Sequence, residues 1–280
     1  MVPRLWAAGK GKLCTMILPS ASPALWLLGL VAAAAYAVPA LVPARWQQAA
    51  VRPALALAWC GHAAVLLWGM LGAVPRFGFG PALSITGWLV LTVYAVERQW
   101  FPQLQARWAL ALLGALAVWL ALLFPGQPLP VTASAWLPLH LALGIACYGL
   151  LAAAVVHAAL MVRAERQMRR GLEAHSGMPL LTLERLTFRF VTAGFVLLTA
   201  TLLAGVLFTE ALYGRAWRWD HKAVFSVLSW VTLAALLLGR WRFGWRGRSA
   251  VRMLYAGTLL LLLAYAGSRF VLEVVLGRGA

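Results

Sequence analysis

The chain has 280 residues, of which 63% are hydrophobic and 11% are charged, and its mean hydropathy is +0.84. This apolar fraction exceeds that of soluble domains and comes in separate runs of about 20 residues, the length that crosses roughly 30 Å of hydrocarbon. Composition therefore excludes a soluble globular protein and predicts an integral protein of the lipid bilayer. The net charge of +17 would suggest nucleic-acid binding in a soluble protein. In a membrane protein Arg and Lys gather in cytoplasmic loops, so we expect no nucleic-acid partner.

Residues 1–15 differ in character from the rest of the chain. They carry Arg4, Lys10 and Lys12, and their apolar stretch is too short for a signal peptide. We interpret residues 1–15 as an unstructured or misannotated N-terminal extension, with Met16 as an alternative start. Residues 16–280 are predicted to form a single transmembrane domain.

The apolar runs that follow predict an all-α, polytopic transmembrane helical bundle of about eight spans. Prolines such as Pro39, Pro53 and Pro125 fall at or near the predicted breaks, where a missing N–H is tolerated, and this supports the partition. The predicted spans are 23–42, 53–73, 82–97, 108–124, 136–161, 188–210, 221–239 and 251–275.

Arginine and lysine are distributed unevenly between the connections. Most of the 24 Arg and Lys residues lie in or at the borders of alternate loops. The positive-inside rule places these loops in the cytoplasm and both termini on the outer, periplasmic side. The pattern therefore predicts a multi-pass protein of the bacterial inner (cytoplasmic) membrane. The basic loops are 43–52, 98–107, 162–187 and 240–250.

Patterns typical of enzymes and transporters are missing from the sequence. Cys14, Cys60 and Cys147 form no CxxC motif, and the chain has no nucleophile–base pattern, phosphate loop or metal-binding spacing. The spans also lack the buried charge pairs and paired broken helices of coupled transporters. We therefore expect neither an enzyme nor a transporter.

The five histidines differ in predicted depth. His140 and His221 open the fifth and seventh spans and share the outer face, while His62 lies near the middle of the second span. His157 follows His140 by 17 residues, about 25 Å along a helix, so these two side chains cannot share a small ligand. His175 lies in a cytoplasmic loop. His140 and His221 therefore form the candidate pair, and His62 approaches them from below.

The segment 217–222, Trp-Arg-Trp-Asp-His-Lys, gathers chemistry that lipid solvation does not require. A neutral imidazole is the commonest axial ligand of haem iron, and two of them from different helices can bind opposite sides of the metal. Trp217 and Trp219 offer flat faces to a macrocycle, Arg218 and Lys222 offer cations to propionates, and Asp220 can orient an imidazole or bind a cation.

Each of these residues also has a purely structural interpretation. Trp217 and Trp219 suit an interfacial aromatic belt, and Arg218 with Asp220 suits an interfacial ion pair. His140 suits an interfacial histidine that hydrogen-bonds to backbone, and His62 suits a hydrogen bond in the core. Both interpretations remain open from the residues alone.

Ordered motifs over the second half of the chain carry a family resemblance. They are His140-L-x-L-x-x-x-x-Tyr148, ERQMRR, LERLTFRFVTAGFVLLTATLLAGVLF, WRWDHKAVFSVLSW, GWRGR and AYAGSRF. From about residue 130 to 275 the sequence resembles the cytochrome c assembly membrane-protein family. It is most similar to the HemX/YpjD-like branch, alongside CcsA and CcmC, and the likeness is weaker through the first four spans.

The resemblance implies an eight-span inner-membrane protein that handles haem, here haem b, with other cytochrome c maturation proteins as partners. It implies a haem site at the outer face, where Trp217, Trp219 and Asp220 occupy the position of a tryptophan-rich segment and His140 that of the preceding histidine. The last span has Arg269, next to Gly267 and Ser268, where haem-presenting members have a second histidine. Either His221 substitutes, or His62 ligates, or this branch does not deliver haem.

We therefore expect a haem-binding accessory protein of cytochrome c biogenesis, with His140 and His221 as ligands of the haem iron and His62 in reserve. The second hypothesis is a non-catalytic regulator or scaffold that binds a cytosolic enzyme of haem synthesis through the arginine-rich loop 162–187. Deletion of that loop in a pull-down experiment distinguishes the two.

Overall fold

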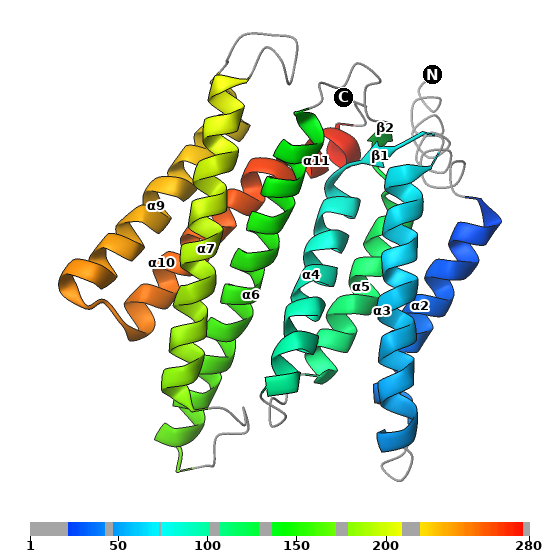
Figure 1. The fold of residues 1–280 in the computed structure, drawn as a ribbon, viewed down its shortest axis with the longest axis horizontal. Helices are drawn as coiled ribbons and strands as arrows, with labels where there is room; N and C mark the ends of the chain where they lie inside the picture. Colours follow the sequence, from blue (N-terminus) through cyan, green and yellow to red (C-terminus); the bar gives the residue numbers. More distant parts are fainter. Residues whose placement is uncertain are drawn as a thin grey trace, which may run out of the picture.

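The computed structural model describes residues 22–42, 47–72, 74–100, 107–128, 136–171, 179–208 and 219–276. In these ranges the chain is a bundle of long helices with one short strand pair (Figure 1). The strands β1 (Arg76–Phe77) and β2 (Gln127–Pro128) are antiparallel. The helices are α2 (Pro23–Leu41), α3 (Gln47–Leu71), α4 (Phe79–Trp100), α5 (Arg107–Leu123), α6 (Leu137–Arg169), α7 (Leu180–Leu207), α9 (His221–Phe243) and α10 (Gly247–Leu262), which continues through η2 (Leu263–Gly267), α11 (Ser268–Phe270) and η3 (Val271–Val275).

The prediction of an all-α, polytopic bundle is confirmed. Seven of the described helical segments are long and apolar enough to cross a membrane, and the segment Ala109–Leu123 is a shorter apolar helix. Together they account for the eight spans predicted from hydropathy. The protein is therefore a multi-pass membrane protein.

The start of one helix differs from the prediction at a proline. Pro53 was expected at the start of the second span but lies inside α3, which begins at Gln47, whereas Pro39 lies inside α2 as it does inside the predicted span 23–42. A proline removes one backbone hydrogen bond, and transmembrane helices tolerate this when neighbouring helices support them. Pro53 therefore did not mark the start of its helix.

The connection predicted as the loop 162–187 is mostly helical. α6 extends to Arg169, well past residue 161, and α7 already begins at Leu180. The added turns of α6 are mostly polar and include a surface pair between Arg169 and Glu165, whose Nη2 and Oε1 atoms lie 2.5 Å apart. Oppositely charged residues at positions i and i+4 stabilise a helix beyond its apolar, membrane-spanning part. A hydropathy profile does not detect such polar helical turns.

The helices pack as two units that meet at α4 and α6. One hydrophobic core lies among α2, α3, α4 and α5, and it includes Tyr36 and Val118. The other lies among α6, α7, α9 and α10, and it includes Leu151 and Leu233. We call the contact between α4 and α6 the seam (Figure 1). At Gly149 the two helices approach so closely that a Cβ atom there would lie 2.6 Å from Cδ1 of Leu89.

The last helix contains π-helical turns and crosses from one unit to the other. The Tyr148 hydroxyl on α6 donates a hydrogen bond to the carbonyl of Leu261, just before the π-helix η2. Beyond η2, the Phe270 ring packs edge-on against Phe79 of α4, with centroids 5.3 Å apart. π-helical turns occur frequently at functional sites.

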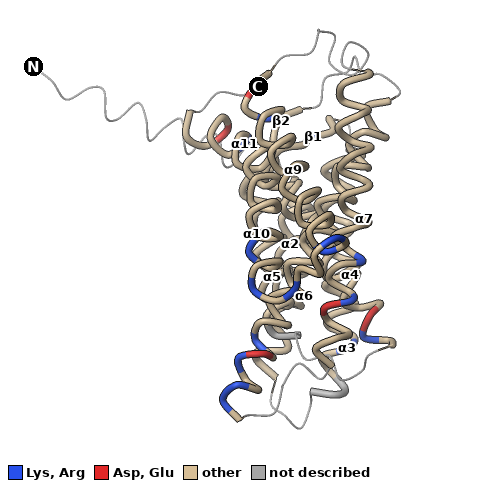
Figure 2. Tube along the Cα trace, turned by 90° about the vertical axis from the view of Figure 1, so that its left-hand side faces the viewer, with Lys and Arg blue, Asp and Glu red and all other residues tan. Residues whose placement is uncertain are grey.

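Arginine residues gather toward one end of the bundle, where α6 and α9 end and α7 and α10 begin (Figure 2). There Nη1 of Arg240 lies 2.7 Å from Oε1 of Glu184, and Nε of Arg246 lies 3.5 Å from the same oxygen. The starts of α4, α6 and α9 lie at the opposite end (Figure 1).

Candidate functional site

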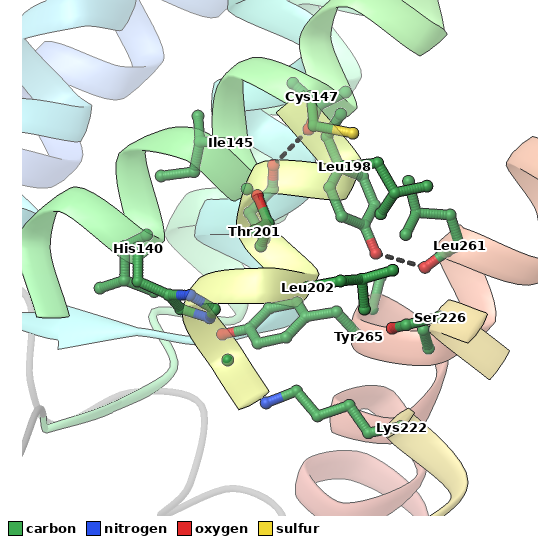
Figure 3. A pocket seen from close by; sticks show the side chains of 18 of the residues that line it. His140, Ile145, Cys147, Leu198, Thr201, Leu202, Lys222, Ser226, Leu261 and Tyr265 are labelled. Carbon is green, nitrogen blue, oxygen red and sulfur yellow. Dashed lines mark hydrogen bonds between the residues drawn. The ribbon is translucent and has the colours of Figure 1, made fainter. Parts of the chain in front are cut away.

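A cavity of about 220 Å³ opens at the end of the bundle opposite the basic side chains. The first turns of α4, α6 and α9, the last turns of α7, and η2 form its walls (Figure 3). We call it the His140 cavity. Its walls are mainly apolar, and their labelled residues in Figure 3 are His140, Ile145, Cys147, Leu198, Thr201, Leu202, Lys222, Ser226, Leu261 and Tyr265.

His140 enters this cavity from the first turn of α6. Pro138 stands at the start of the helix, where the fixed φ angle and missing N–H of proline are favourable. The His140 amide donates to the Trp136 carbonyl at 3.0 Å, so the imidazole projects from an ordered first turn. One turn further, Gly144 lines the same wall, and the nearest atom to a Cβ placed there is Cγ2 of Thr201 at 3.9 Å. The absence of a side chain at Gly144 therefore keeps the space beside His140 open.

Lys222 and Tyr265 lie on the opposite wall from α6 (Figure 3). The Nζ atom of Lys222 lies 5.3 Å from the centroid of the Tyr265 ring, and Cζ of Arg269 lies 5.9 Å from the same centroid. Contacts of this kind between a cation and an aromatic ring are attractive, and more so where water is excluded. Among the described residues that line the cavity, the wall formed by α9 and η2 therefore carries one cation, Lys222, next to the Tyr265 ring.

Asp220 lines the cavity and also caps α9. Its Oδ1 accepts a hydrogen bond from the Ala223 amide at 2.9 Å, in the N-cap geometry that satisfies a helix N-terminus. His221 follows as the first residue of α9; its side chain is exposed, and it is not among the residues that line the cavity. Trp219 is 70% exposed, as an interfacial aromatic residue would be. The predicted residues Trp217 and Arg218 lie outside the described ranges.

His62 lies in the core of the other unit and is fully buried. Its Nε2 atom is 2.8 Å from the Ser84 hydroxyl, and its Nδ1 atom is 3.4 Å from the Tyr36 hydroxyl. These contacts satisfy both ring nitrogens within the protein. The structure thus brings His140, Asp220 and Lys222 to one cavity and places His62 in the other unit, while His221, between two lining residues, is not itself among those that line the cavity.

Two features of the described structure were missed from the sequence. Tyr265 lies within an apolar run, and only the later polar residues Ser268 and Arg269 hinted that this turn faces protein. The second is a buried contact of 2.9 Å between Oε2 of Glu97 and Nε2 of His157, two polar side chains whose pairing was not predicted from the sequence. The two residues are 60 positions apart, and no local pattern links them.

The donor set of the His140 cavity suits a metal that arrives within a cofactor. Among the described residues, no group of three or more His, Cys, Asp or Glu side chains is arranged to hold a metal ion. A single imidazole in an apolar cavity can instead bind the metal of an apolar macrocycle, and a lysine on the opposite wall can bind a carboxylate on the edge of that macrocycle.

Comparison with known proteins gives consistent matches. Residues 125–276 match the family described as cytochrome C assembly protein. The chain is 31% identical over 199 residues to inner membrane protein YpjD of Escherichia coli strain K12, an alignment that covers 70% of this chain and 74% of the relative. It is 28% identical to cytochrome c biogenesis protein CcsA of Synechococcus sp. strain CC9902, with 72% of this chain and 77% of the relative covered. No solved structure matches significantly.

The matched region begins just before α6 and ends in the last helix, so it contains every wall of the His140 cavity except the one from β1 and α4. The relatives extend the likeness into the first unit. The resemblance inferred from the ordered motifs is thereby confirmed, and the chain belongs to the cytochrome c assembly protein family.

Proposed function

We propose that this chain is a haem-handling protein of cytochrome c biogenesis in the bacterial inner membrane, and that haem binds in the His140 cavity. Family membership supports the role in cytochrome c biogenesis. The observation that carries the haem assignment is the position of His140, which faces an apolar cavity whose opposite wall holds Lys222 (Figure 3).

The residues present fit haem in three respects. Haem contains an iron that accepts an imidazole nitrogen as axial ligand, and His140 offers one. Leu83, Leu198 and Leu202 give apolar walls to a macrocycle. Lys222 offers an ammonium group to a propionate. The enclosed volume of about 220 Å³ lies below the roughly 300 Å³ lower bound of common ligand pockets, so a haem would project from the cavity on its open side.

A second ligand from this chain is proposed to be His221. Its exposed side chain stands directly before Lys222, on the first turn of α9. Because Asp220 caps that turn, the backbone that carries His221 is ordered at the edge of the cavity. His62 contributes nothing to this site in the proposal, since both of its ring nitrogens have partners in the other unit.

The test is absorption spectroscopy of detergent-purified protein from haem-replete cells. The expected result is a haem Soret band that His140→Ala reduces strongly and His140→Ala/His221→Ala abolishes. His62→Gln is the matched control and retains haem. Full retention of haem by the double variant, or a haem-free wild-type protein after reconstitution, contradicts the proposal.

A further inference from the structure

The connection between α9 and α10 presents aromatic and basic side chains on the surface of the protein. We call residues 240–249 the basic turn. Within it every residue from 241 to 249 is exposed. Trp241 and Phe243 are 79% and 73% exposed, although both are large and apolar. Aromatic residues with this much free surface are typical of a membrane–water interface or of a surface that binds a partner.

The basic turn has a fixed shape despite its exposure. Gly244 has a φ angle of 64°, and its amide donates to the Arg240 carbonyl at 3.0 Å, which closes the end of α9. The Trp245 ring packs on Gly239, where a Cβ atom would lie 2.3 Å from Cε3 of the indole. The rings of Trp245 and Phe243 are stacked, with centroids 6.3 Å apart. The exposed side chains therefore project from an ordered backbone, which lowers the cost of ordering on binding.

The positive charge of the basic turn is only partly balanced. Its four arginines are Arg240, Arg242, Arg246 and Arg248. Oε1 of Glu184 on α7 lies 2.7 Å from Arg240 and 3.5 Å from Arg246. Between described residues, no ion pair includes Arg242 or Arg248. The basic turn therefore carries an excess of positive charge and is complementary to an anion.

The position of the basic turn along the bundle favours a lipid as the source of that anion. The turn joins two segments that are long and apolar enough to cross a membrane, of 23 and 29 residues. It stops short of the last turns of α6, which carry Arg169 (Figure 1, Figure 2). A turn between two spans lies at the edge of the apolar layer, where indole rings lie at the level of the headgroups.

We propose that the basic turn binds an anionic phospholipid from the leaflet on this side of the membrane. Arg242 and Arg248 bind the negatively charged headgroup, and Trp241 and Phe243 lie against the upper part of the acyl chains. The His140 cavity is at the opposite end of the bundle, so this site is independent of haem binding.

The test is competition between two lipids for the full chain in micelles of a neutral detergent, with bound lipid measured by native mass spectrometry. The probes are phosphatidylglycerol, which is anionic, and phosphatidylcholine with the same acyl chains, which has no net charge. Wild-type protein is expected to prefer phosphatidylglycerol. Arg242→Gln/Arg248→Gln should reduce this preference about tenfold or more, because each arginine near an anionic lipid surface contributes roughly fivefold.

Arg163→Gln/Arg170→Gln is the matched control. It removes the same number of charges from exposed positions at the end of α6, and in the described part of the chain neither arginine takes part in an ion pair. Its preference should stay close to that of the wild type. Arg242→Lys/Arg248→Lys keeps the positive charge and should keep most of the preference.

A second variant tests the apolar contact and leaves every arginine in place. Trp241→Gln/Phe243→Gln should weaken the binding of both lipids and change their ratio little, because the lost contact is with the acyl chains. This variant also keeps the proposal testable if Arg242→Gln/Arg248→Gln does not fold. Unchanged affinity for both lipids in the aromatic variant contradicts the proposal.

Three further results would overturn it. Equal losses of preference in the glutamine variants of the basic turn and of α6 would show a general response to net charge. Displacement of phosphatidylglycerol by an equal concentration of sn-glycerol 3-phosphate would show that the basic turn recognises a free phosphate. A wild type that does not prefer phosphatidylglycerol would leave the basic turn to another class of partner, such as an acidic protein.

Discussion

Arg240 and Glu184 form the shortest described link between α9 and α7, with 2.7 Å between Nη1 and Oε1. Arg246, at the start of α10, lies 3.5 Å from the same carboxylate oxygen. The Arg240 guanidinium also lies over the Phe188 ring, 3.6 Å from its centroid. One carboxylate, 14% exposed, therefore holds the turn between α9 and α10 against α7.

Removing the charge of Glu184 should destabilise this end of the bundle. We expect Glu184→Gln to lower the free energy of unfolding by about 1–3 kcal/mol, since a partly buried charge-assisted hydrogen bond is lost. Glu165→Gln is the control, because its partner Arg169 is 64% exposed and such pairs contribute about 0.5 kcal/mol. Equilibrium unfolding in detergent measures the free energy of unfolding of both variants. Equal losses of this free energy would show that Glu184 contributes no more than an exposed surface pair.

The cap at Asp220 gives a second prediction. Asp220→Ala should lower stability by about 1 kcal/mol, because the Ala223 amide loses its acceptor. Asp220→Ser keeps an N-cap oxygen and should remain close to the wild type in thermal unfolding. A serine variant as unstable as the alanine variant would show that the carboxylate acts through its charge and not as a cap.

Gly144 and Gly149, five residues apart on α6, should respond in opposite ways to a side chain. Gly144→Leu places a large apolar group in the His140 cavity, and we expect haem binding to weaken at least about tenfold while stability is retained. Gly149→Ala forces a Cβ against Leu89 at the seam and should lower stability by about 1–3 kcal/mol.

Gly144→Ala completes this comparison, since its nearest neighbour at 3.9 Å leaves room for a methyl group. It should fold like the wild type. Haem titration and thermal unfolding of the three variants report the two effects separately. If the Gly144→Leu variant binds haem as tightly as the wild type, haem does not bind in the His140 cavity.

The ammonium group of Lys222 should discriminate haem from its dimethyl ester. Wild-type protein is expected to bind the diacid about tenfold or more tightly than the ester, because one charge-assisted contact contributes roughly 1.5–3 kcal/mol. Lys222→Met should abolish this preference, and Lys222→Arg should restore it. Competition titrations measure the ratio, and a preference unchanged in Lys222→Met excludes Lys222 as the propionate contact.

Much of the fold followed from hydropathy, because each span must bury its backbone polar groups in a helix of fixed length. Hydropathy did not predict where α6 ends. The last turns of this helix, which include Glu165 and Arg169, are polar and are stabilised by a contact between charged side chains. Pro53 misled the predicted start of α3, because a membrane helix can contain a proline.

The site was predictable only in part. Depth along the spans placed His140 and Lys222 at one end, and both line the cavity. Rotation about each helix axis was not predictable, and it decides that His62 faces Ser84 and that His221 stays exposed. The contact between Glu97 and His157 was also not predictable from the sequence, since these residues become neighbours only when α4 packs on α6.

The π-helical turns of the last helix give it two packing registers in one continuous segment. Before η2, Gly257 packs on Leu233 of α9; after it, Phe270 meets Phe79, and Glu273 lies against Gly78, where a Cβ would be 2.8 Å from its carboxylate. Each residue of an α-helix advances the surface by about 100°. A one-residue deletion between Leu263 and Gly267 would therefore shorten the helix by only one residue and keep its apolar character, yet turn Phe270 and Glu273 away from the unit that they hold. In the five residues of η2, apolar substitutions should thus be tolerated far better than a deletion.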